Sequence, residues 1–425
     1  MLHTDRAVDI LVYGATGFTG KLVCAHLKAR YLDSPLPEDS ITMAIGGRSK
    51  EKLEKVKAEL GLPSTVQIFV VDSSDAGGLR DVCQQTKAVI TLVGPYALHG
   101  DALISACAEN GTHYFDLTGE TLWASRQISK LSDKAKESKA IIISSCGFDS
   151  VPSDLSTMIA ARELKQITGN DSSLGRVTSG FQAQGGVSGG TVASMLNMYD
   201  EGIVALRRVM SCYLLSPIKG PQEWTGEWIT REQSLTGGFF VMAPHNGAIV
   251  RRSWGLLESS PEIVPQKARY GPKFTYDEYM ITKGPVTAFL LTLTFRILGV
   301  VLLLPQLRQL VKRYGPQSGD GPSKKTRDSG WFKLISTAHS AEDDVQVRVT
   351  MRGTKDPGYG WTSVCIAECA VTVIKSHDQL PPLARYGGFL TPATGLGDAL
   401  CRRLESAKMI KIDTEVLKNE KKKQN

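Results

Sequence analysis

The chain has 425 residues, of which 42% are hydrophobic and 22% are charged, and its formal net charge is +7. This balance excludes an intrinsically disordered chain and a collagen-like repeat, and the length predicts two domains because one hydrophobic core rarely organises so many residues. The basic residues are dispersed apart from three lysines at 421–423, so we expect no nucleic-acid partner. Eight cysteines without zinc-like spacing predict reduced thiols, no metal site and a cytoplasmic location.

An apolar run at 10–13 is followed at once by three glycines and then by a helical pattern. The run is typical of a buried parallel strand, and the glycines are spaced as a dinucleotide-binding turn requires. Such a turn brings backbone N–H groups to a pyrophosphate at the start of a helix. The predicted cofactor-binding residues of this loop are Gly14, Thr16, Gly17, Phe18, Thr19 and Gly20. The alternative is that the glycines serve only a turn.

The second apolar run, at 41–46, ends in Gly47, Arg48 and Ser49. NAD-binding proteins usually place an acidic residue here, on the ribose 2′-hydroxyl. Arg48 offers a cation and Ser49 a hydroxyl, which suit a 2′-phosphate, so the sequence favours NADP(H) over NAD(H). The alternative is that Arg48 is an ordinary surface arginine. Asp72 follows a third predicted strand at 66–71 and is expected to reach the adenine end of the cofactor.

Three more strands, at 88–93, 113–117 and 140–144, alternate with helical segments that include 79–86 and 100–110. Six strands separated by helices predict an α/β fold with a doubly wound parallel Rossmann sheet. The fourth strand ends in Gly94 and Pro95, at the carboxyl edge where ligands collect, so both residues are predicted to contact the cofactor.

Tyr96, Glu120 and Asp149 are the candidate catalytic residues, because each follows one of the last three predicted strands. Tyr96 is expected beside the nicotinamide, where it could donate a proton or stack on the ring. Glu120 and Asp149 could relay protons or order the site. A structural role is the alternative for all three, with Tyr96 packing under its loop and the two acids capping helices. Spacing alone identifies no catalytic dyad.

The strongest compositional departure is the apolar segment 286–304, which has Arg296 near its centre. As a helix it would be about 28 Å long, close to the thickness of a bilayer core. A central arginine costs about 2.5–3.5 kcal/mol on insertion scales, which makes spanning only marginally favourable. We therefore expect a helix or hairpin lying in a lipid interface, with Arg296 reaching toward water and Pro305 ending the helix. The alternative is a buried core helix or a homodimer interface.

Further along the chain, residues 345–351 alternate as an antiparallel strand would, and residues 365–374 predict a helix belonging to the second domain. Seven motifs together carry a family resemblance: GATGFTG at 14–20, GGRS at 46–49, VGPYALHG at 93–100, DLTGE at 116–120, GFDSVPSDL at 147–155, KDPGYGWTS at 355–363 and GGFLTPATGLGDAL at 387–400. The chain resembles the saccharopine dehydrogenase-like oxidoreductases, and within them the branch that holds trans-acting enoyl reductases and a lipid-droplet-associated member.

The resemblance implies an NADP-binding Rossmann domain at 1–154 and an inserted α/β domain at 155–380 for substrate binding or dimerisation. A C-terminal segment, 381–425, would return to the first domain. The implied activity is NADPH-dependent reduction of a C=C bond in a polyketide or lipid-like acyl thioester, free or carrier-bound. Alternatives are an imine reductase of the saccharopine dehydrogenase type and a non-catalytic nucleotide-binding protein on lipid droplets. The resemblance adds peripheral attachment to membranes or lipid droplets to the expected cytoplasmic location.

Overall fold

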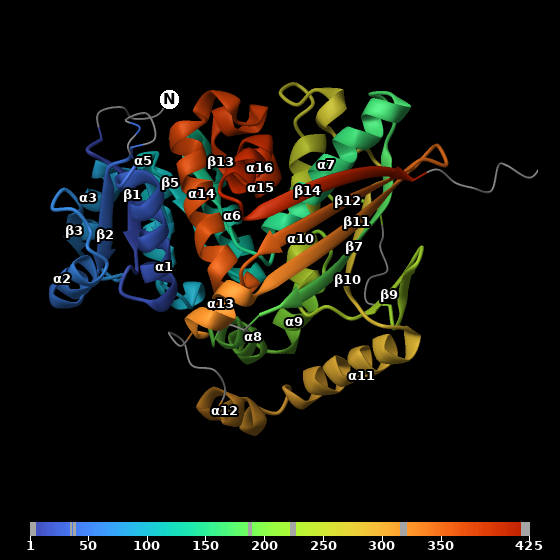
Figure 1. Ribbon diagram of the computed structural model, residues 1–425, viewed down its shortest axis with the longest axis horizontal. Coiled ribbons are helices and arrows are strands. Elements are labelled where there is room, and N and C mark those ends of the chain that lie inside the picture. The colour runs from blue at the N-terminus through green and yellow to red at the C-terminus, as the bar shows by residue number, and fades with distance from the viewer. Residues whose placement is uncertain are drawn as a thin grey trace, which may run out of the picture.

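The computed structural model describes residues 6–34, 36, 40–185, 189–221, 227–314 and 321–417, so the basic tail at 421–423 lies outside the described residues. In that part of the chain the first sheet has seven parallel strands in the order β13-β6-β5-β4-β1-β2-β3 (Figure 1). The strands are β1 (Val8–Tyr13), β2 (Met43–Gly47), β3 (Gln67–Val70), β4 (Thr86–Thr91), β5 (His113–Phe115), β6 (Ile141–Ile143) and β13 (Gly388–Leu390). The predicted doubly wound Rossmann sheet is confirmed.

Both faces of this sheet are covered, which explains why its strands are apolar throughout rather than alternating. Ile10 and Val12 of β1 belong to one buried cluster, whereas Leu11 and Tyr13 belong to another on the opposite face. The first cluster includes side chains from α1 (Phe18–Leu27) and α2 (Lys50–Glu59). The second includes side chains from α3 (Ala76–Gln85), α5 (Asp101–Asn110) and α6 (Thr121–Glu137).

The second sheet is mixed, with the order β14-β12-β11-β7-β10-β9-β8. Only β7 and β10 pair in parallel among its described strands. Its strands are β7 (Leu174–Gln184), β8 (Thr230–Glu232), β9 (Leu235–Gly238), β10 (Thr275–Ile281), β11 (Trp331–Ser340), β12 (Gln346–Thr354) and β14 (Ile410–Leu417). Helices α7 (Val151–Thr168) and α10 (Ala243–Glu258) pack against it and against each other. α7 is the next element after β6, with seven residues between them, and it packs on β11 and β12, so it connects the rim of the first sheet to the second sheet.

The chain after β12 corrects the expected domain assignment. Helix α14 (Thr362–Lys375), which the sequence placed in the inserted domain, packs against α1, β4 and β5 of the Rossmann sheet. The buried carboxylate of Glu368 holds it there, 2.8 Å from His26 Nε2 and 2.6 Å from the Tyr31 hydroxyl. The C-terminal segment also divides: β13 extends the first sheet beside β6, whereas β14 pairs with β12 in the second. The segment therefore ties the two sheets together instead of returning to one.

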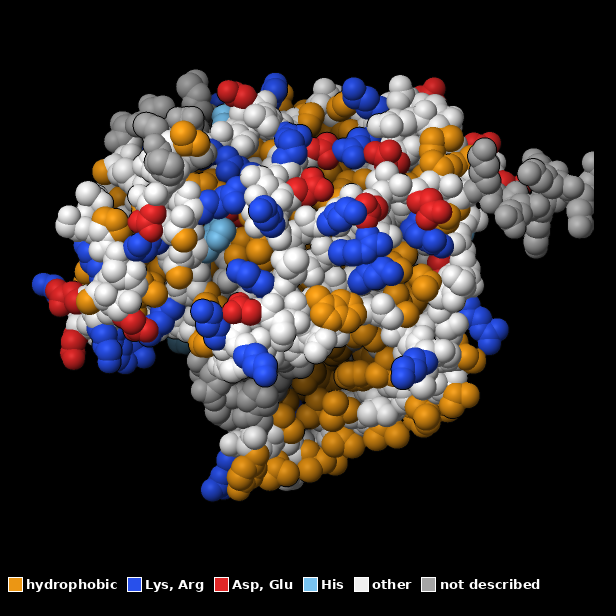
Figure 2. All heavy atoms as spheres, viewed as in Figure 1, with side chains coloured by type: hydrophobic (Ala, Val, Ile, Leu, Met, Phe, Trp, Pro, Cys, Tyr) orange, Lys and Arg blue, Asp and Glu red, His pale blue; other side chains and the backbone are white. Residues whose placement is uncertain are grey.

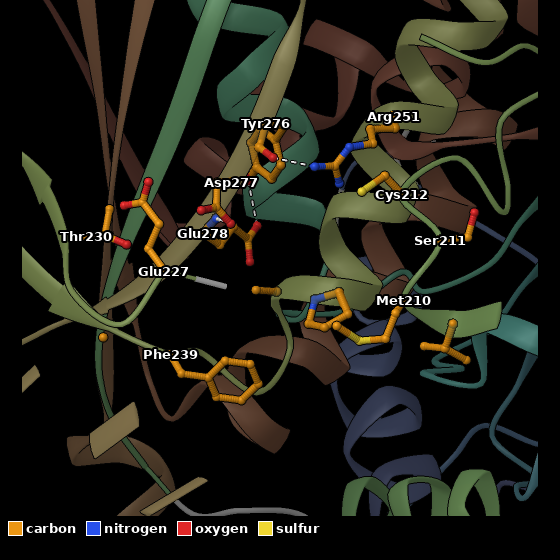
Figure 3. Close-up of a pocket in the computed structure, with 14 residues that line it drawn as sticks. Met210, Ser211, Cys212, Glu227, Thr230, Phe239, Arg251, Tyr276, Asp277 and Glu278 are labelled. Carbon is orange, nitrogen blue, oxygen red and sulfur yellow. Dashed lines mark hydrogen bonds between the residues drawn. The ribbon is translucent and has the colours of Figure 1, made fainter. Parts of the chain in front are cut away.

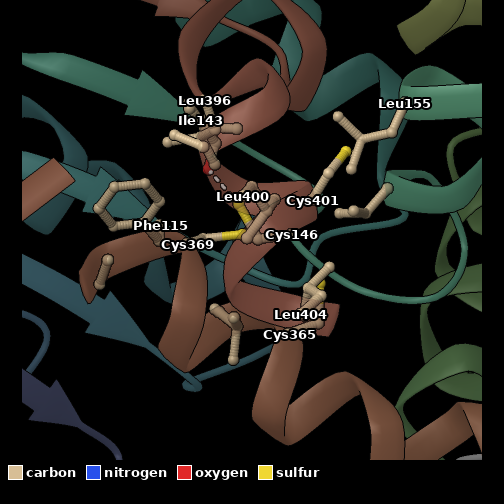
Figure 4. Close-up of a cluster of buried hydrophobic side chains, with 14 of the residues drawn as sticks. Phe115, Ile143, Cys146, Leu155, Cys365, Cys369, Leu396, Leu400, Cys401 and Leu404 are labelled. Atoms are coloured by element: carbon tan, nitrogen blue, oxygen red, sulfur yellow. Dashed lines mark hydrogen bonds between the residues drawn. The ribbon is translucent and has the colours of Figure 1, made fainter. Parts of the chain in front are cut away.

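Five cysteines belong to the buried cluster that contains the side chains of α14, and Cys146, Cys365, Cys369 and Cys401 are labelled in Figure 4; the fifth is Cys24 of α1. They are surrounded by leucines of α7 and of α16 (Gly397–Ser406), and all eight cysteines of the chain are free thiols. The remaining helices of seven residues or more are α8 (Gly189–Asp200), α9 (Ile203–Val209), α11 (Pro285–Val301) and α12 (Pro305–Tyr314). The short ones are α4 (Tyr96–His99), α13 (Lys324–Ser329) and α15 (Pro392–Gly395).

The apolar segment forms α11 and the turn after it, along the lower edge of the molecule in Figure 1. Only Ala288 and Thr292 of α11 are buried, where the helix rests on β9, so the alternative of a core helix is wrong. Pro305 does not simply end the segment but begins α12. Among the described residues, no single helix has the length and apolar character to cross a membrane. α11 and α12 together have that length and apolar character, but the pair is bent by 108°.

Candidate cofactor and active site

The glycine turn after β1 has the shape that a pyrophosphate needs. Gly14 has a φ of +88°, and a Cβ atom there would lie 2.8 Å from the Val93 side chain, so β1 and β4 meet closely at the point where strand order reverses. A Cβ on Gly20 would lie 2.3 Å from the Gly14 carbonyl oxygen. Gly17 precedes α1, whose first turn has no side-chain cap and no acidic residue. The N–H groups of that turn are therefore directed at the edge of the sheet, ready for an anion.

The other predicted residues of this loop divide by role. Thr16 and Thr19 are half-buried and form no side-chain hydrogen bond within the described chain, so their hydroxyls remain available to a ligand. The Phe18 ring instead packs edge-on against Tyr359 at 5.0 Å, with the Arg327 guanidinium 5.1 Å from its centre. Phe18 thus contributes its backbone N–H to the turn while its side chain fixes the loop against the 355–361 segment. Sequence reasoning did not foresee this contact, which depends on residues more than 300 positions away.

Arg48 and Asp72 lie at the adjacent ends of β2 and β3. Arg48 is exposed and forms no hydrogen bond or ion pair with the described residues, which suits a guanidinium reserved for a ligand phosphate. Ser49 caps α2, its hydroxyl oxygen accepting from the Lys52 N–H at 3.4 Å. Hydrogen bonds from the backbone and hydroxyl of Ser74 lower the pKa of Asp72, and the charge of Arg48 lowers it further.

Gly94 and Pro95 follow β4 at the predicted nicotinamide end, joined by a cis peptide bond, and the Tyr96 side chain behind them is buried and hydrogen-bonded to the backbone. The Tyr96 hydroxyl donates to the Thr91 carbonyl and accepts from the Leu117 N–H, both at 3.1 Å. The side chain is buried, and desolvation raises its pKa well above the usual value. A hydroxyl held in this way is poorly placed to give up a proton, so the structure favours the packing alternative over the catalytic one.

The two candidate acids, Glu120 and Asp149, differ in their hydrogen bonding. The two carboxylate oxygens of Glu120 accept from the backbone N–H groups of Tyr96 at 2.8 Å and Ala97 at 2.9 Å, so Glu120 caps α4, as the structural alternative held. Asp149 lies half-buried in the turn before α7 and makes no hydrogen bond with the described residues. Desolvation raises its pKa to about 6. The structure therefore brings Tyr96 and Glu120 together. Of the three candidate catalytic residues, Asp149 is the one whose side chain could exchange a proton.

His245 joins the two domains at this rim, and no motif or spacing in the sequence selects it. Its Nδ1 lies 2.8 Å from the Thr121 hydroxyl and its Nε2 lies 2.9 Å from the Ser145 hydroxyl. Ser145 donates its own proton to the Thr118 carbonyl at 2.6 Å, so it accepts from His245 Nε2–H. Burial lowers the pKa of His245 to about 4, which keeps the ring neutral. A histidine of α10 thus orders the loops that follow β5 and β6.

Asp116, at the end of β5, orders the same loops from the Rossmann side. Its Oδ1 accepts from the backbone N–H groups of Thr118 and Ser145, both at 2.9 Å, and desolvation raises its pKa to about 6. Ser145 adopts a φ of +63°, so the backbone is bent sharply where these bonds are made. The DLTGE motif at 116–120 therefore builds the rim, with Asp116 turned inward and Glu120 capping its neighbour.

The uncapped start of α1, the close glycine turn and the exposed Arg48 are features with which Rossmann domains bind a phosphorylated dinucleotide. The saccharopine dehydrogenase NADP binding domain matches this chain over residues 10–143. A protein of Mycobacterium tuberculosis (strain H37Rv) named trans-acting enoyl reductase is 33% identical over 440 residues, which cover 96% of this chain and 98% of that one. Its namesake from Mycobacterium leprae is 35% identical over 450 residues, with the same coverage.

Among solved structures, the saccharopine dehydrogenase (L-Glu forming) of Saccharomyces cerevisiae matches with a TM-score of 0.53. The match covers 97% of this chain and 100% of that chain at 11% identity, which shows the shared fold. The chain belongs to the saccharopine dehydrogenase-like family, together with the trans-acting enoyl reductases, as the motifs indicated. It is an NADP-dependent oxidoreductase.

Proposed function

We propose that this protein is an NADPH-dependent enoyl reductase that acts in trans on an acyl thioester of lipid or polyketide type. The observation that carries this proposal is the 33–35% identity, over nearly the full length of both chains, to proteins named trans-acting enoyl reductases. The uncapped start of α1 and the free guanidinium of Arg48 support the choice of cofactor.

The chain's own residues would bind, orient and shield the reactants. Bound NADPH supplies the hydride, which is delivered to the β-carbon of the C=C bond. The α-carbon must then receive a proton, and the unbonded carboxyl of Asp149, with its pKa near 6, is the best-placed donor among the predicted residues. Glu120, Asp116 and His245 hold the surrounding loops in place through the bonds described above, so that the reacting groups meet in a fixed geometry.

The test is NADPH oxidation by the purified full-length chain. trans-2-Octenoyl N-acetylcysteamine thioester should be reduced to the octanoyl thioester, and Asp149→Asn should slow turnover by about 100-fold or more, the usual range for a lost proton donor. Oxidation of NADPH only with a mixture of an amino acid and a keto acid would assign imine reduction instead. Tight NADPH binding without turnover on either substrate would leave a nucleotide-binding role, and the enoyl reductase proposal would fail.

We also propose that the protein attaches peripherally to a lipid surface through the apolar surface of α11 and α12. This surface is defined by the exposed residues Val286, Phe289, Leu290, Ile297, Leu298, Val300, Leu303, Leu304, Leu310 and Tyr314, and it lines the lower edge of the molecule in Figure 2. Arg296 lies in its middle with its guanidinium 4.0 Å from the centre of the Trp228 ring. Residues 283–314 contain five lysines and arginines and no acid. Arg308 and Lys312 pair with Asp200, so the charge offered to anionic headgroups comes from Lys283, Arg296 and Arg313.

Flotation with liposomes of phosphatidylcholine and phosphatidylserine tests this attachment. The wild type should float with the vesicles, and the double variant Leu290→Glu/Val300→Glu should not, because both side chains are more than half exposed and charge there opposes insertion. Ile167→Glu, an exposed apolar position on α7, is the matched control and should float normally. Wild-type protein that stays unbound, with a dimer that the double variant dissociates, would instead assign the surface to a homodimer.

A further inference from the structure

Residues 321–330 form a strap between α12 and β11, and the proposed function leaves this strap unassigned. It contains α13, which the Ser323 hydroxyl caps by accepting from the Thr326 N–H at 3.2 Å. The strap leads into the second sheet, but it lies on the cofactor-binding turn of the first domain (Figure 1). A Cβ atom on Gly321 would be 2.2 Å from the Phe18 ring, and the Arg327 guanidinium lies 5.1 Å from the centre of that ring.

The segment 355–361 holds the strap in this place. The Arg327 carbonyl accepts from the Asp356 N–H at 2.8 Å. The buried carboxylate of Asp356 accepts in turn from two backbone N–H groups of its own segment, both at 3.0 Å. Tyr359 of this segment packs edge-on against Phe18, with the ring centres 5.0 Å apart. Arg327 therefore reaches the turn from a support that hydrogen bonds and aromatic packing fix.

The turn beneath the strap has unused hydrogen-bond donors. Lys21 is the first residue of α1 whose N–H is bonded within the helix, to the Gly17 carbonyl at 3.0 Å. The N–H groups of residues 18–20 make no hydrogen bond within the described chain. Such a helix start carries about half a positive charge, whereas the diphosphate of a dinucleotide carries a negative charge on each phosphate. The turn alone therefore leaves most of the diphosphate charge unbalanced.

Arg327 can supply the missing positive charge. Residues 14–20 contain no cation, and Lys21, the next residue, pairs with Glu59 at 2.8 Å. Arg327 is half-buried and forms no ion pair with the described residues. One of its N–H groups donates to the Pro322 carbonyl at 2.7 Å, which fixes the side chain and leaves other donors of the planar guanidinium for a ligand. A guanidinium of this kind matches the geometry of phosphate oxygens.

The pocket between β10, α10 and the loop after α9 is unsuited to phosphate (Figure 3). Glu227, Asp277 and Glu278 line it, together with Arg251, whose guanidinium donates to a backbone carbonyl of β10. Glu278 accepts from Asn246 Nδ2 at 2.9 Å, and burial raises its pKa to about 8. A phosphate entering this pocket would meet the acidic side chains. Of these two unassigned features of the second domain, the strap is the one that can take an anion.

We propose that Arg327 binds the diphosphate of NADP(H), so that the strap forms the outer wall of the cofactor site over the first turn of α1. The backbone N–H groups of the turn and the guanidinium then share the phosphate oxygens. Since the strap continues into β11, the bound cofactor contacts both domains. Arg48 responds to the 2′-phosphate, whereas Arg327 contributes alike to NADPH and NADH. This inference rests on the cofactor class and not on the identity of the substrate.

Titration of the purified full-length protein with NADPH and with NADH, followed by nicotinamide fluorescence, tests the assignment. Arg327→Gln should raise the Kd for both cofactors about tenfold, because both carry the diphosphate and lose a charge-assisted hydrogen bond. Arg48→Ala should weaken the binding of NADPH alone. Lys325→Gln is the matched control, since it removes an exposed charge from the same short helix, and it should change either Kd by less than about twofold.

Ionic strength separates a contact with phosphate from mere packing on Phe18. The wild-type Kd for NADH should rise between about 50 and about 500 mM NaCl, because salt screens the attraction between charges. The rise should be smaller in Arg327→Gln. Phe18→Leu removes the aromatic ring but keeps the guanidinium, so its salt dependence should match that of the wild type. Arg327→Lys keeps the charge and should recover most of the affinity that Arg327→Gln loses.

Hydrogen exchange of the amides at 321–330 gives a readout at the strap itself. Saturating NADPH should slow this exchange in the wild type and in Arg48→Ala, because a strap that contacts the cofactor opens less often once the cofactor is bound. In Arg327→Gln at saturation the slowing should be smaller. If Arg327 serves only to pack on Phe18, NADPH should leave the exchange of these amides unchanged.

The outcomes separate the strap from the proposed function. Wild-type affinity of Arg327→Gln for both cofactors would overturn the assignment. A loss of affinity with wild-type salt dependence, and with strap amides that do not respond to NADPH, would also overturn it and leave Arg327 a packing residue. Because every readout is cofactor binding, a wild type that reduces no enoyl thioester would leave the assignment standing. A wild type that binds neither cofactor would overturn it together with the cofactor class.

Discussion

Replacing Arg48 by alanine should remove much of the difference between the affinities for NADPH and for NADH. The guanidinium lies at the end of β2, exposed and without a hydrogen bond or ion pair in the described chain, so its removal leaves no buried partner unsatisfied. A charge-assisted hydrogen bond contributes about 1.5–3 kcal/mol to binding. Because Arg48 is exposed to solvent, we expect its bond to the 2′-phosphate to lie at the lower end of this range. A loss of about 1.5 kcal/mol raises the Kd for NADPH roughly tenfold. The Kd for NADH, which lacks the 2′-phosphate, should change less than about twofold.

The assay is titration of each purified variant with NADPH and with NADH, followed by the fluorescence of the reduced nicotinamide. Lys50→Ala is the matched control, since this lysine is two positions away on α2, is 73% exposed and faces Glu54 at 3.8 Å. Asp72→Asn extends the test: removing the neighbouring carboxylate charge should tighten NADPH binding and leave NADH binding nearly unchanged. Equal losses of NADPH and NADH affinity in Arg48→Ala would refute the phosphate role, and Arg48 would then be an ordinary surface arginine.

Three further predictions concern buried groups. Tyr96→Phe should lower the free energy of unfolding, measured in urea, by about 1–3 kcal/mol, because the Thr91 carbonyl and the Leu117 N–H lose their partner. The kcat of the folded variant should stay within about twofold of wild type. A large loss of kcat in a stable variant would support the catalytic role instead. Glu368→Gln should cost about 3–5 kcal/mol in the same assay, and a loss below about 1 kcal/mol would contradict a tie between α14 and α1. Burial raises the pKa of Asp154 to about 6 in the folded state, above its unfolded value, so its contribution to stability is greatest below pH 4 and declines as the pH rises from about 4 to about 6. Asp154→Asn should lack that decline when unfolding is measured at both ends of this range, and an unchanged slope would contradict the raised pKa.

The sequence predicts that the candidate cofactor-binding residues lie together because its signals for them are local. Gly14, Gly17 and Gly20 fall within seven residues, and Arg48 follows the next strand directly, so chain order alone brings them to one edge of a parallel sheet. Phe18 shows the limit of the same reasoning. Its place in the motif suggested a contact with the cofactor, but its ring packs on Tyr359, which no spacing rule connects to it.

The contacts around the candidate catalytic residues join positions that are distant in the chain. His245 reaches Ser145 across 100 positions, and Glu278 meets Asn246 from a separate strand. A lone histidine or glutamate in a sequence carries no sign of its neighbours, and the pKa values of both groups follow from burial, which only packing determines. Position after a strand selected Tyr96, Glu120 and Asp149 alike, and hydrogen bonding separated them.

The sequence by itself determined the Rossmann sheet, the glycine turn, the cofactor type and an unusually apolar segment, because hydrophobic period, glycine spacing and strand order act over short stretches of chain. Only the tertiary structure decided that α14 belongs beside α1 and that β14 joins the second sheet. It also decided that α11 rests on the protein by Ala288 and Thr292 alone. Such facts depend on which faces are buried against which, and burial is a property of the assembled chain.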